Sequence, residues 1–87
     1  ATYCSYDIDF VDPSYAPGTG TPEIGGPNSF QAQQVIRELL GVNLIGADLV
    51  EVAPPFDSEG NTAWLGISLM FELLCGLSVA LQARKNQ

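Results

Sequence analysis

Two aspartates separated by a single residue, Asp7 and Asp9, are the part of this sequence best suited to chemistry. Side chains alternate between the two faces of a β-strand, so both carboxylates are expected to point the same way. Carboxylates this close repel each other and lose solvation when buried, unless a cation lies between them. Carboxylate oxygens are also the ligands that hard divalent metal ions prefer. The pair therefore predicts a metal site.

Aspartates at the end of a strand also have a structural interpretation. They commonly form turns and caps, and Asp12-Pro13 is an ordinary turn signal. The spacing alone leaves both interpretations open. An EF-hand is excluded, because Val11 would occupy the third ligand position and Gly18 stands where the closing glutamate is required.

A strand–helix–strand unit is predicted around these aspartates. Residues 2–10 form the first strand, and residues 11–27 form a long loop of Pro and Gly that is either functional or disordered. A helix follows, with Asn28 as its N-cap, Gln31 completing a capping box and Gly41 as its stop. Residues 43–52 form a second, nearly continuously apolar strand, as in a parallel sheet covered on both faces.

A third acid, Glu51, lies at the end of the second predicted strand. The crossover of a βαβ unit is almost always right-handed, and its two strands are parallel. The carboxyl ends of parallel strands share one edge, where open α/β sheets bind ligands. We therefore expect Asp7, Asp9 and Glu51 to converge at that edge, which strengthens the metal interpretation.

The final predicted element is a helix over residues 62–84, apolar almost all round, with Thr62 as its cap and Trp64 and Met70 in the core. About 20 apolar residues suffice to span a membrane. A charge at the bilayer centre costs about 2.5–3.5 kcal/mol, however, and Glu72 lies mid-helix. A helix packed against the sheet is therefore favoured, and no membrane partner is expected.

Composition bounds the remaining possibilities. The chain has 87 residues, enough for one small domain at most, and ten acids against three bases give a net charge of -7. That charge argues against nucleic acid as a partner, because phosphates require a basic surface. Cys4 and Cys75 have no CxxC spacing and are expected to be buried free thiols of a cytoplasmic protein.

Longer stretches of the sequence resemble the ureohydrolases, the arginase and agmatinase family of dimanganese hydrolases. The resemblance rests on SYDID (5–9), DP (12–13), APGTGTPEIGG (16–26), GADLVEVAP (46–54) and TA (62–63). It covers nearly the whole chain, and residues 16–18 with Glu23 are more similar to agmatinases and guanidino-acid hydrolases than to true arginases. The family fold is a three-layer α/β/α sandwich with a mainly parallel sheet. The resemblance therefore implies an α/β fold class, with this chain as the carboxyl-terminal βαβα part.

The resemblance also implies a role for each acid. Asp7 matches the carboxylate that bridges two Mn²⁺ ions, and Asp9 matches a carboxylate that binds one of them. Glu51 matches the glutamate that holds the guanidinium group of a small guanidino substrate. The family's metal ions activate water for attack on the guanidinium carbon, which yields urea and an amine. No further catalytic residue is assigned to this chain.

One departure from the family determines the interpretation. The family's other metal ligands come from histidine-containing motifs, and this chain has no histidine. Residues 1–87 are therefore expected to be the carboxyl-terminal fragment of a single ureohydrolase domain. The fragment should be inactive alone, and its parent a cytoplasmic homotrimer or homohexamer. Agmatine is the first expected substrate of that parent. A guanidino acid such as 4-guanidinobutyrate is the alternative, and a non-catalytic assembly module is another.

Overall fold

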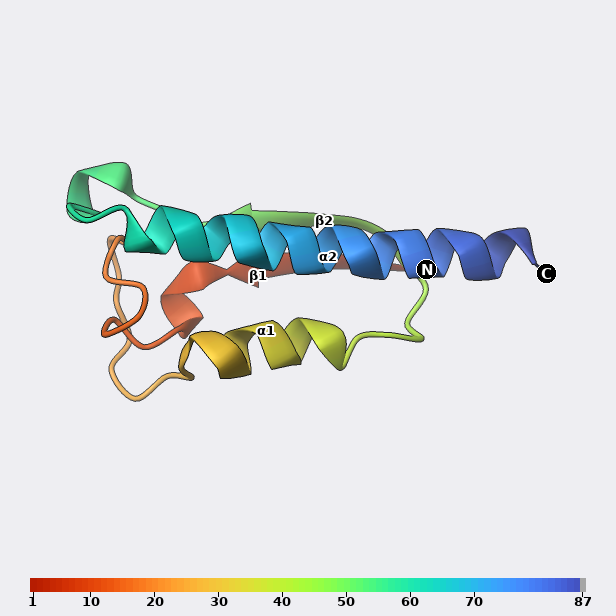
Figure 1. Cartoon of the computed structure of the whole chain (residues 1–87), viewed down its shortest axis with the longest axis horizontal. Helices are drawn as coiled ribbons and strands as arrows, with labels where there is room; N and C mark the ends of the chain where they lie inside the picture. The colour runs from red at the N-terminus through yellow and green to blue at the C-terminus, as the bar shows by residue number, and fades with distance from the viewer. Residues whose placement is uncertain (87) are drawn as a thin grey trace.

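The computed structural model describes residues 1–86, which form a two-stranded sheet, a short helix and a long one (Figure 1). In chain order the elements are strand β1 (Thr2–Asp7), the 3₁₀ turn η1 (Ile8–Phe10), helix α1 (Ser29–Arg37), strand β2 (Leu44–Val50), the 3₁₀ turn η2 (Pro54–Phe56) and helix α2 (Asn61–Lys85). This order confirms the predicted α/β class and its βαβα sequence of elements.

The two strands pair in parallel, as the βαβ prediction requires. Tyr6 lies opposite Leu49, and Asp7 lies opposite Val50. The loops that follow β1 and β2 lie at the same end of the molecule (Figure 1). The carboxyl ends of both strands therefore share one edge of the sheet.

The core joins one face of the sheet to both helices. Its buried members are Tyr6, Ile8, Val11, Ala16, Ala32, Ile36, Leu65, Leu69 and Leu73. The hydroxyl of Tyr6 donates to the carbonyl of Ala32 at 3.0 Å, which satisfies the polar end of the ring inside the core. Burial raises the pKa of Tyr6 to about 12. Residues 1–86 thus form one sheet layer and one helical layer of the expected sandwich.

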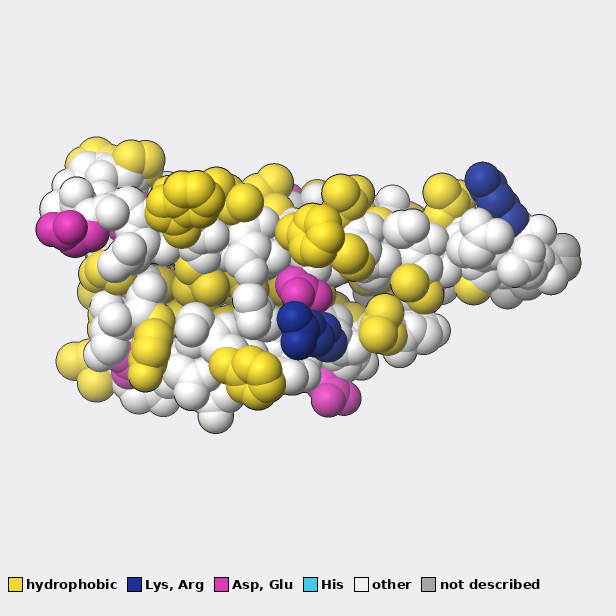
Figure 2. Space-filling model, in the orientation of Figure 1, with side chains coloured by type: hydrophobic (Ala, Val, Ile, Leu, Met, Phe, Trp, Pro, Cys, Tyr) yellow, Lys and Arg dark blue, Asp and Glu magenta, His cyan; other side chains and the backbone are white. Residues whose placement is uncertain are grey.

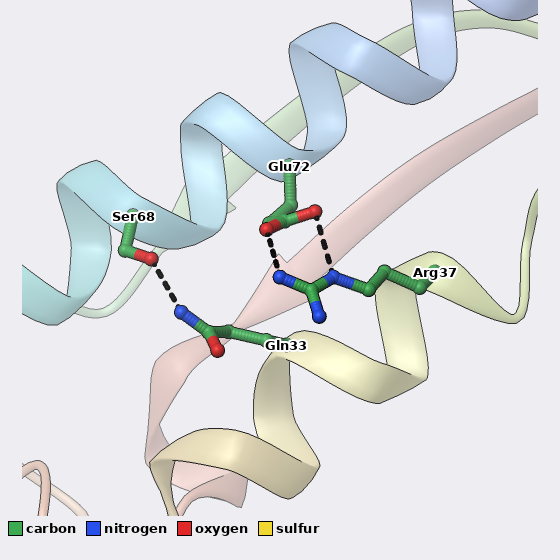
Figure 3. Close-up of polar contacts among 4 residues, drawn as sticks. All are labelled: Gln33, Arg37, Ser68 and Glu72. Carbon is green, nitrogen blue, oxygen red and sulfur yellow. Dashed lines mark hydrogen bonds and ion pairs between the residues drawn. The ribbon is translucent and has the colours of Figure 1, made fainter.

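Polar side chains connect α1 to α2 beside this core (Figure 3). The amide of Gln33 donates to the hydroxyl of Ser68 at 2.7 Å. The guanidinium of Arg37 donates to both carboxylate oxygens of Glu72, at 2.7 and 3.2 Å. These bonds lower the pKa of Glu72 below its ordinary value. The charge in the middle of α2 is therefore paired with a neighbouring helix.

The predicted start of α1 is confirmed, whereas its end falls earlier than predicted. Asn28 Oδ1 accepts from the Gln31 N–H at 2.8 Å, and Gln31 Oε1 accepts from the Asn28 N–H at 2.9 Å, which is a complete capping box. The α-helix stops at Arg37, and the N–H groups of Leu39 and Leu40 bond to carbonyls three residues back in a tighter turn. Gly41, with φ of +99°, follows that turn.

The outer surface of α2 overturns part of the predicted core. Trp64 and Met70 are 71% and 57% exposed, and Cys75 is exposed while Cys4 is partly buried. Figure 2 shows apolar side chains gathered along this helix. By length and composition alone α2 could cross a membrane, and 22% of its most apolar 18-residue window is buried. A helix apolar on every side does not reveal which side packs, and the described residues cover only one.

Candidate active site

Asp7 and Asp9 lie next to each other at the end of β1, in a geometry that differs from the predicted one. The strand ends at Asp7, whose carboxylate accepts a hydrogen bond from the Asp9 N–H at 3.0 Å and caps the turn η1. The prediction of a strand through residue 10 is therefore wrong, because this local bond competes with the sheet ladder. The turn, rather than strand alternation, brings the two aspartates together.

The surroundings of Asp7 disfavour its charged form. Desolvation raises the pKa of Asp7, and the neighbouring Asp9 carboxyl adds to this rise, against a lowering by the Asp9 N–H. A cation beside the pair would stabilise both ionised carboxylates. The two hard oxygen donors therefore fit part of a metal site. Within residues 1–86 no group of three His, Cys, Asp or Glu residues is close enough to hold a metal ion.

Glu51 lies at the same edge and has a strained backbone. It follows Val50, the residue opposite Asp7 in the parallel register. Its φ of 73° is the one positive value found at a non-glycine position among residues 1–86. This conformation costs roughly 1–3 kcal/mol and is concentrated at functional sites. The structure thus places all three acids at one edge. Metal binding by Asp7 and Asp9 and substrate binding by Glu51 stay predictions.

The loop over residues 11–27 folds back onto the turn after β1. The hydroxyl of Thr21 donates to Asp9 Oδ2 at 2.6 Å and orients that carboxylate. Asp12 accepts from the N–H groups of Ser14 and Gly25 at 2.8 and 2.9 Å, and these bonds lower the pKa of Asp12. Asp12 therefore braces the turn that the Asp12-Pro13 signal indicates.

A second set of contacts joins this loop to the segment after β2 and to the start of α2. The N–H of Gly18 donates to Thr62 Oγ1 at 2.8 Å, and its carbonyl accepts from the Ala53 N–H at 2.7 Å. Asp57 accepts from the N–H groups of Thr62 and Ala63 at 3.0 and 2.9 Å. Asp57 therefore caps α2, and the prediction of Thr62 as the cap is wrong.

The capping role of Asp57 was not predicted from the sequence. The N-cap position is occupied by Gly60, which has φ of 74° and no side chain to accept a bond. Asp57, which directly follows the turn η2 and lies three residues before Gly60, supplies the missing acceptor. Desolvation raises the pKa of Asp57, but the bonds from Ala63 and Thr62 outweigh it and lower the pKa below its ordinary value. The sequence signal for this cap was an Asp directly after the Pro-Pro-Phe segment.

Asp48 and Thr19 are two further polar residues with contrasting environments. Asp48 accepts from the hydroxyls of Ser5 at 2.6 Å and Tyr3 at 2.9 Å, and these bonds lower the pKa of Asp48. Asp48 is thus hydrogen-bonded across the two strands and is only partly buried. The hydroxyl of Thr19 is buried and has no hydrogen-bond partner within the described chain.

Comparison with known proteins shows the family to which the chain belongs. A family model described as the Arginase family matches residues 1–76. The chain is 62% identical over 77 residues to guanidinopropionase of Pseudomonas aeruginosa, which covers 88% of this chain and 24% of that protein. It is 60% identical over 75 residues to the mitochondrial agmatinase of Gallus gallus, which covers 86% of this chain and 22% of that protein.

Solved structures agree with the sequence matches. Proclavaminate amidino hydrolase from Streptomyces clavuligerus superposes with a TM-score of 0.85 at 41% identity, over 90% of this chain and 26% of that chain. The chain spans about a quarter of the length of the relatives it matches. The fold is therefore shared with one segment of these larger proteins.

Proposed function

The chain belongs to the arginase family, and we propose that it supplies part of the active site of an enzyme that hydrolyses a small guanidino compound to urea and an amine. The observation that carries this proposal is the placement of Asp7, Asp9 and Glu51 at one edge of a parallel sheet. Relatives named guanidinopropionase and agmatinase support the substrate class.

Asp7 and Asp9 are proposed as ligands of a divalent metal, with two Mn²⁺ ions in the complete site. Their adjacency and the raised pKa of Asp7 suit a bound cation. Further ligands must come from outside these residues, because the chain has no histidine. When bound, such ions lower the pKa of water toward neutrality. Thr21 keeps one oxygen of Asp9 fixed in direction.

Glu51 is proposed to hold the substrate. A carboxylate and a guanidinium form two parallel charge-assisted hydrogen bonds, which fix the plane of the guanidinium group. Glu51 has a left-handed backbone conformation just beyond the end of β2. Binding in a fixed orientation presents the guanidinium carbon to the activated water.

Residues outside this segment bind the end of the substrate that is remote from the guanidinium group. The chain is almost equally similar to a relative named for a guanidino acid and to one named for agmatine, at 62% and 60% identity. One substrate ends in a carboxylate and the other in an amine, so this segment serves the guanidinium end that they share. Agmatine is our first proposed substrate, and 4-guanidinobutyrate is the alternative.

Location and assembly remain predictions for the complete protein. We propose a cytoplasmic homotrimer or homohexamer, with no nucleic-acid partner. A stand-alone assembly module is not favoured, because the matched relatives carry the same segment inside proteins named as enzymes.

A chimeric enzyme tests the proposed function. This chain replaces the matching quarter of P. aeruginosa guanidinopropionase, and urea release is measured with and without Mn²⁺ against agmatine, 4-guanidinobutyrate and 3-guanidinopropionate. We expect Mn²⁺-dependent urea release from at least one substrate. Asp7→Ala should lower kcat/KM by more than about 100-fold, because a metal ligand is lost.

A matched control distinguishes the loss of a site carboxylate from the loss of any exposed carboxylate. Glu38→Gln changes an exposed acid at the end of α1, and it should keep kcat/KM within about threefold of the chimera. Glu51→Gln should mainly weaken substrate binding, because a neutral amide bonds guanidinium poorly. Full activity of the Asp7→Ala chimera would end the assignment.

A further inference from the structure

Three segments meet at Gly18 on the carboxyl edge. The N–H of Gly18 bonds to the hydroxyl of Thr62, 44 residues away, and its carbonyl bonds to the N–H of Ala53. Thr62 is fully buried, in the first turn of α2. One peptide unit on each side of Gly18 is therefore held by a different part of the chain.

The fit around Gly18 is too close for a side chain. A methyl group at this position would lie 2.5 Å from the Cβ of Asp57 and 2.9 Å from the Cβ of Thr62. Asp57 in turn bonds to the N–H of Thr62, so loop, turn and helix form one connected unit. We call Gly18, Ala53, Asp57 and Thr62 the loop junction.

The loop junction is connected along the chain to both halves of the candidate active site. Along the first loop, Thr21 follows Gly18 by three residues and bonds to Asp9. Along the second segment, Glu51 precedes Ala53 by two residues. A shift at the junction would therefore move the metal-binding carboxylates relative to the substrate-binding one.

We infer that Thr62 is a positioning residue whose hydroxyl, through Gly18, sets the placement of Glu51 relative to Asp7 and Asp9. This inference rests on the proposed function. Thr62 acts in this proposal through its bond to Gly18, because its side chain is fully buried. A displacement of about 1 Å in an active site lowers turnover roughly 100-fold, so one buried hydroxyl has a measurable effect on catalysis.

The test compares threonine variants in the P. aeruginosa chimera. Thr62→Val keeps the volume and removes the acceptor, and we expect kcat to fall about 10–100-fold with KM within about threefold. Thr62→Ser retains the hydroxyl and should recover kcat to within about threefold of the unsubstituted chimera. Thr19→Val is the matched control, because it removes a buried hydroxyl from the same loop that has no partner in the described chain.

Fold and metal loading are measured separately from turnover. Circular dichroism and Mn²⁺ titration by calorimetry should show Thr62→Val folded and loaded with metal. Unchanged kcat in a folded Thr62→Val, or equal losses in Thr62→Ser or Thr19→Val, would overturn the inference.

A second variant covers the case in which Thr62→Val does not fold. Asp57→Asn weakens the same junction from a partly exposed position and should lower kcat by a smaller factor, at least about threefold. Unchanged kcat in Asp57→Asn would then overturn the inference. If the unsubstituted chimera releases no urea, it is the proposed function that fails.

Discussion

The carboxyl edge of the sheet and the outer face of α2 differ in how far the chain completes them. At the edge, Asp12, Asp57 and Thr62 all have hydrogen-bond partners within the chain. On α2, Trp64 and Phe71 are 71% and 63% exposed. An apolar hollow of about 390 Å³ also opens between α2 and β2. This chain therefore supplies the hydrogen-bond partners that its carboxyl edge needs, but not the apolar contacts that would cover α2.

The physical reason lies in the forces that act on the two regions. The bonds at the edge are directional and connect loops within the chain, so they form once the βαβ unit is folded. Burial of apolar surface supplies most of the folding free energy, and it requires atoms on both sides of a helix. The chain is elongated along α2, with extents of 46 × 22 × 17 Å.

The largest effect is expected when the isolated 87-residue chain is studied in solution. Its exposed apolar face should drive self-association, and Trp64→Gln with Phe71→Gln should lower the weight-average mass roughly threefold or more by sedimentation. Tyr15→Gln removes an exposed aromatic ring from the loop after β1 and should leave the mass unchanged. A folded, monomeric unsubstituted chain would contradict this view of α2.

A smaller effect is expected from glycines in the loop at the edge. A methyl group on Gly26 would clash with the carbonyl of Phe10 and lie 2.9 Å from the backbone nitrogen of Asp12. Gly26→Ala should lower the chimera's free energy of unfolding, measured with urea, by about 3 kcal/mol. Gly20→Ala meets nothing within 4 Å and should be neutral or slightly stabilising. Equal free energies of unfolding for the two variants would show that Gly26 does not pack closely against the backbone of Phe10 and Asp12.

The pattern of elements could be predicted from the sequence, and so could the capping box of α1. These depend on spacings within a few residues and on the handedness of crossovers. The shared edge of Asp7 and Glu51 followed from the same rule. The bond from Gly18 to Thr62 could not be predicted, because it joins residues 44 positions apart. The positive φ of Glu51 likewise depends on tertiary context.

The smallest effect concerns acid stability. The pKa values of Asp12, Asp48, Asp57 and Glu72 are all lowered in the folded chain. Their stabilisation is therefore fully present above the unfolded values of 3.8 for Asp and 4.5 for Glu, and it is lost as the pH falls through the folded values. The urea midpoint of the chimera should drop on acidification through this range.

Glu72→Gln isolates one contribution to that drop. The amide cannot titrate, so the fall in the urea midpoint should be smaller by roughly 0.3 M, the amount expected for a solvent-screened ion pair. An identical fall in both proteins would mean that the bond between Arg37 and Glu72 in Figure 3 adds nothing to stability in solution.

The most direct test of the central claim is an anomalous-scattering map, at the manganese absorption edge, of a crystal of the Mn²⁺-loaded chimera. We predict density within coordination distance of the carboxylates of Asp7 and Asp9, with Glu51 facing the same cavity. Manganese bound elsewhere, with these two carboxylates free of metal, would contradict the account.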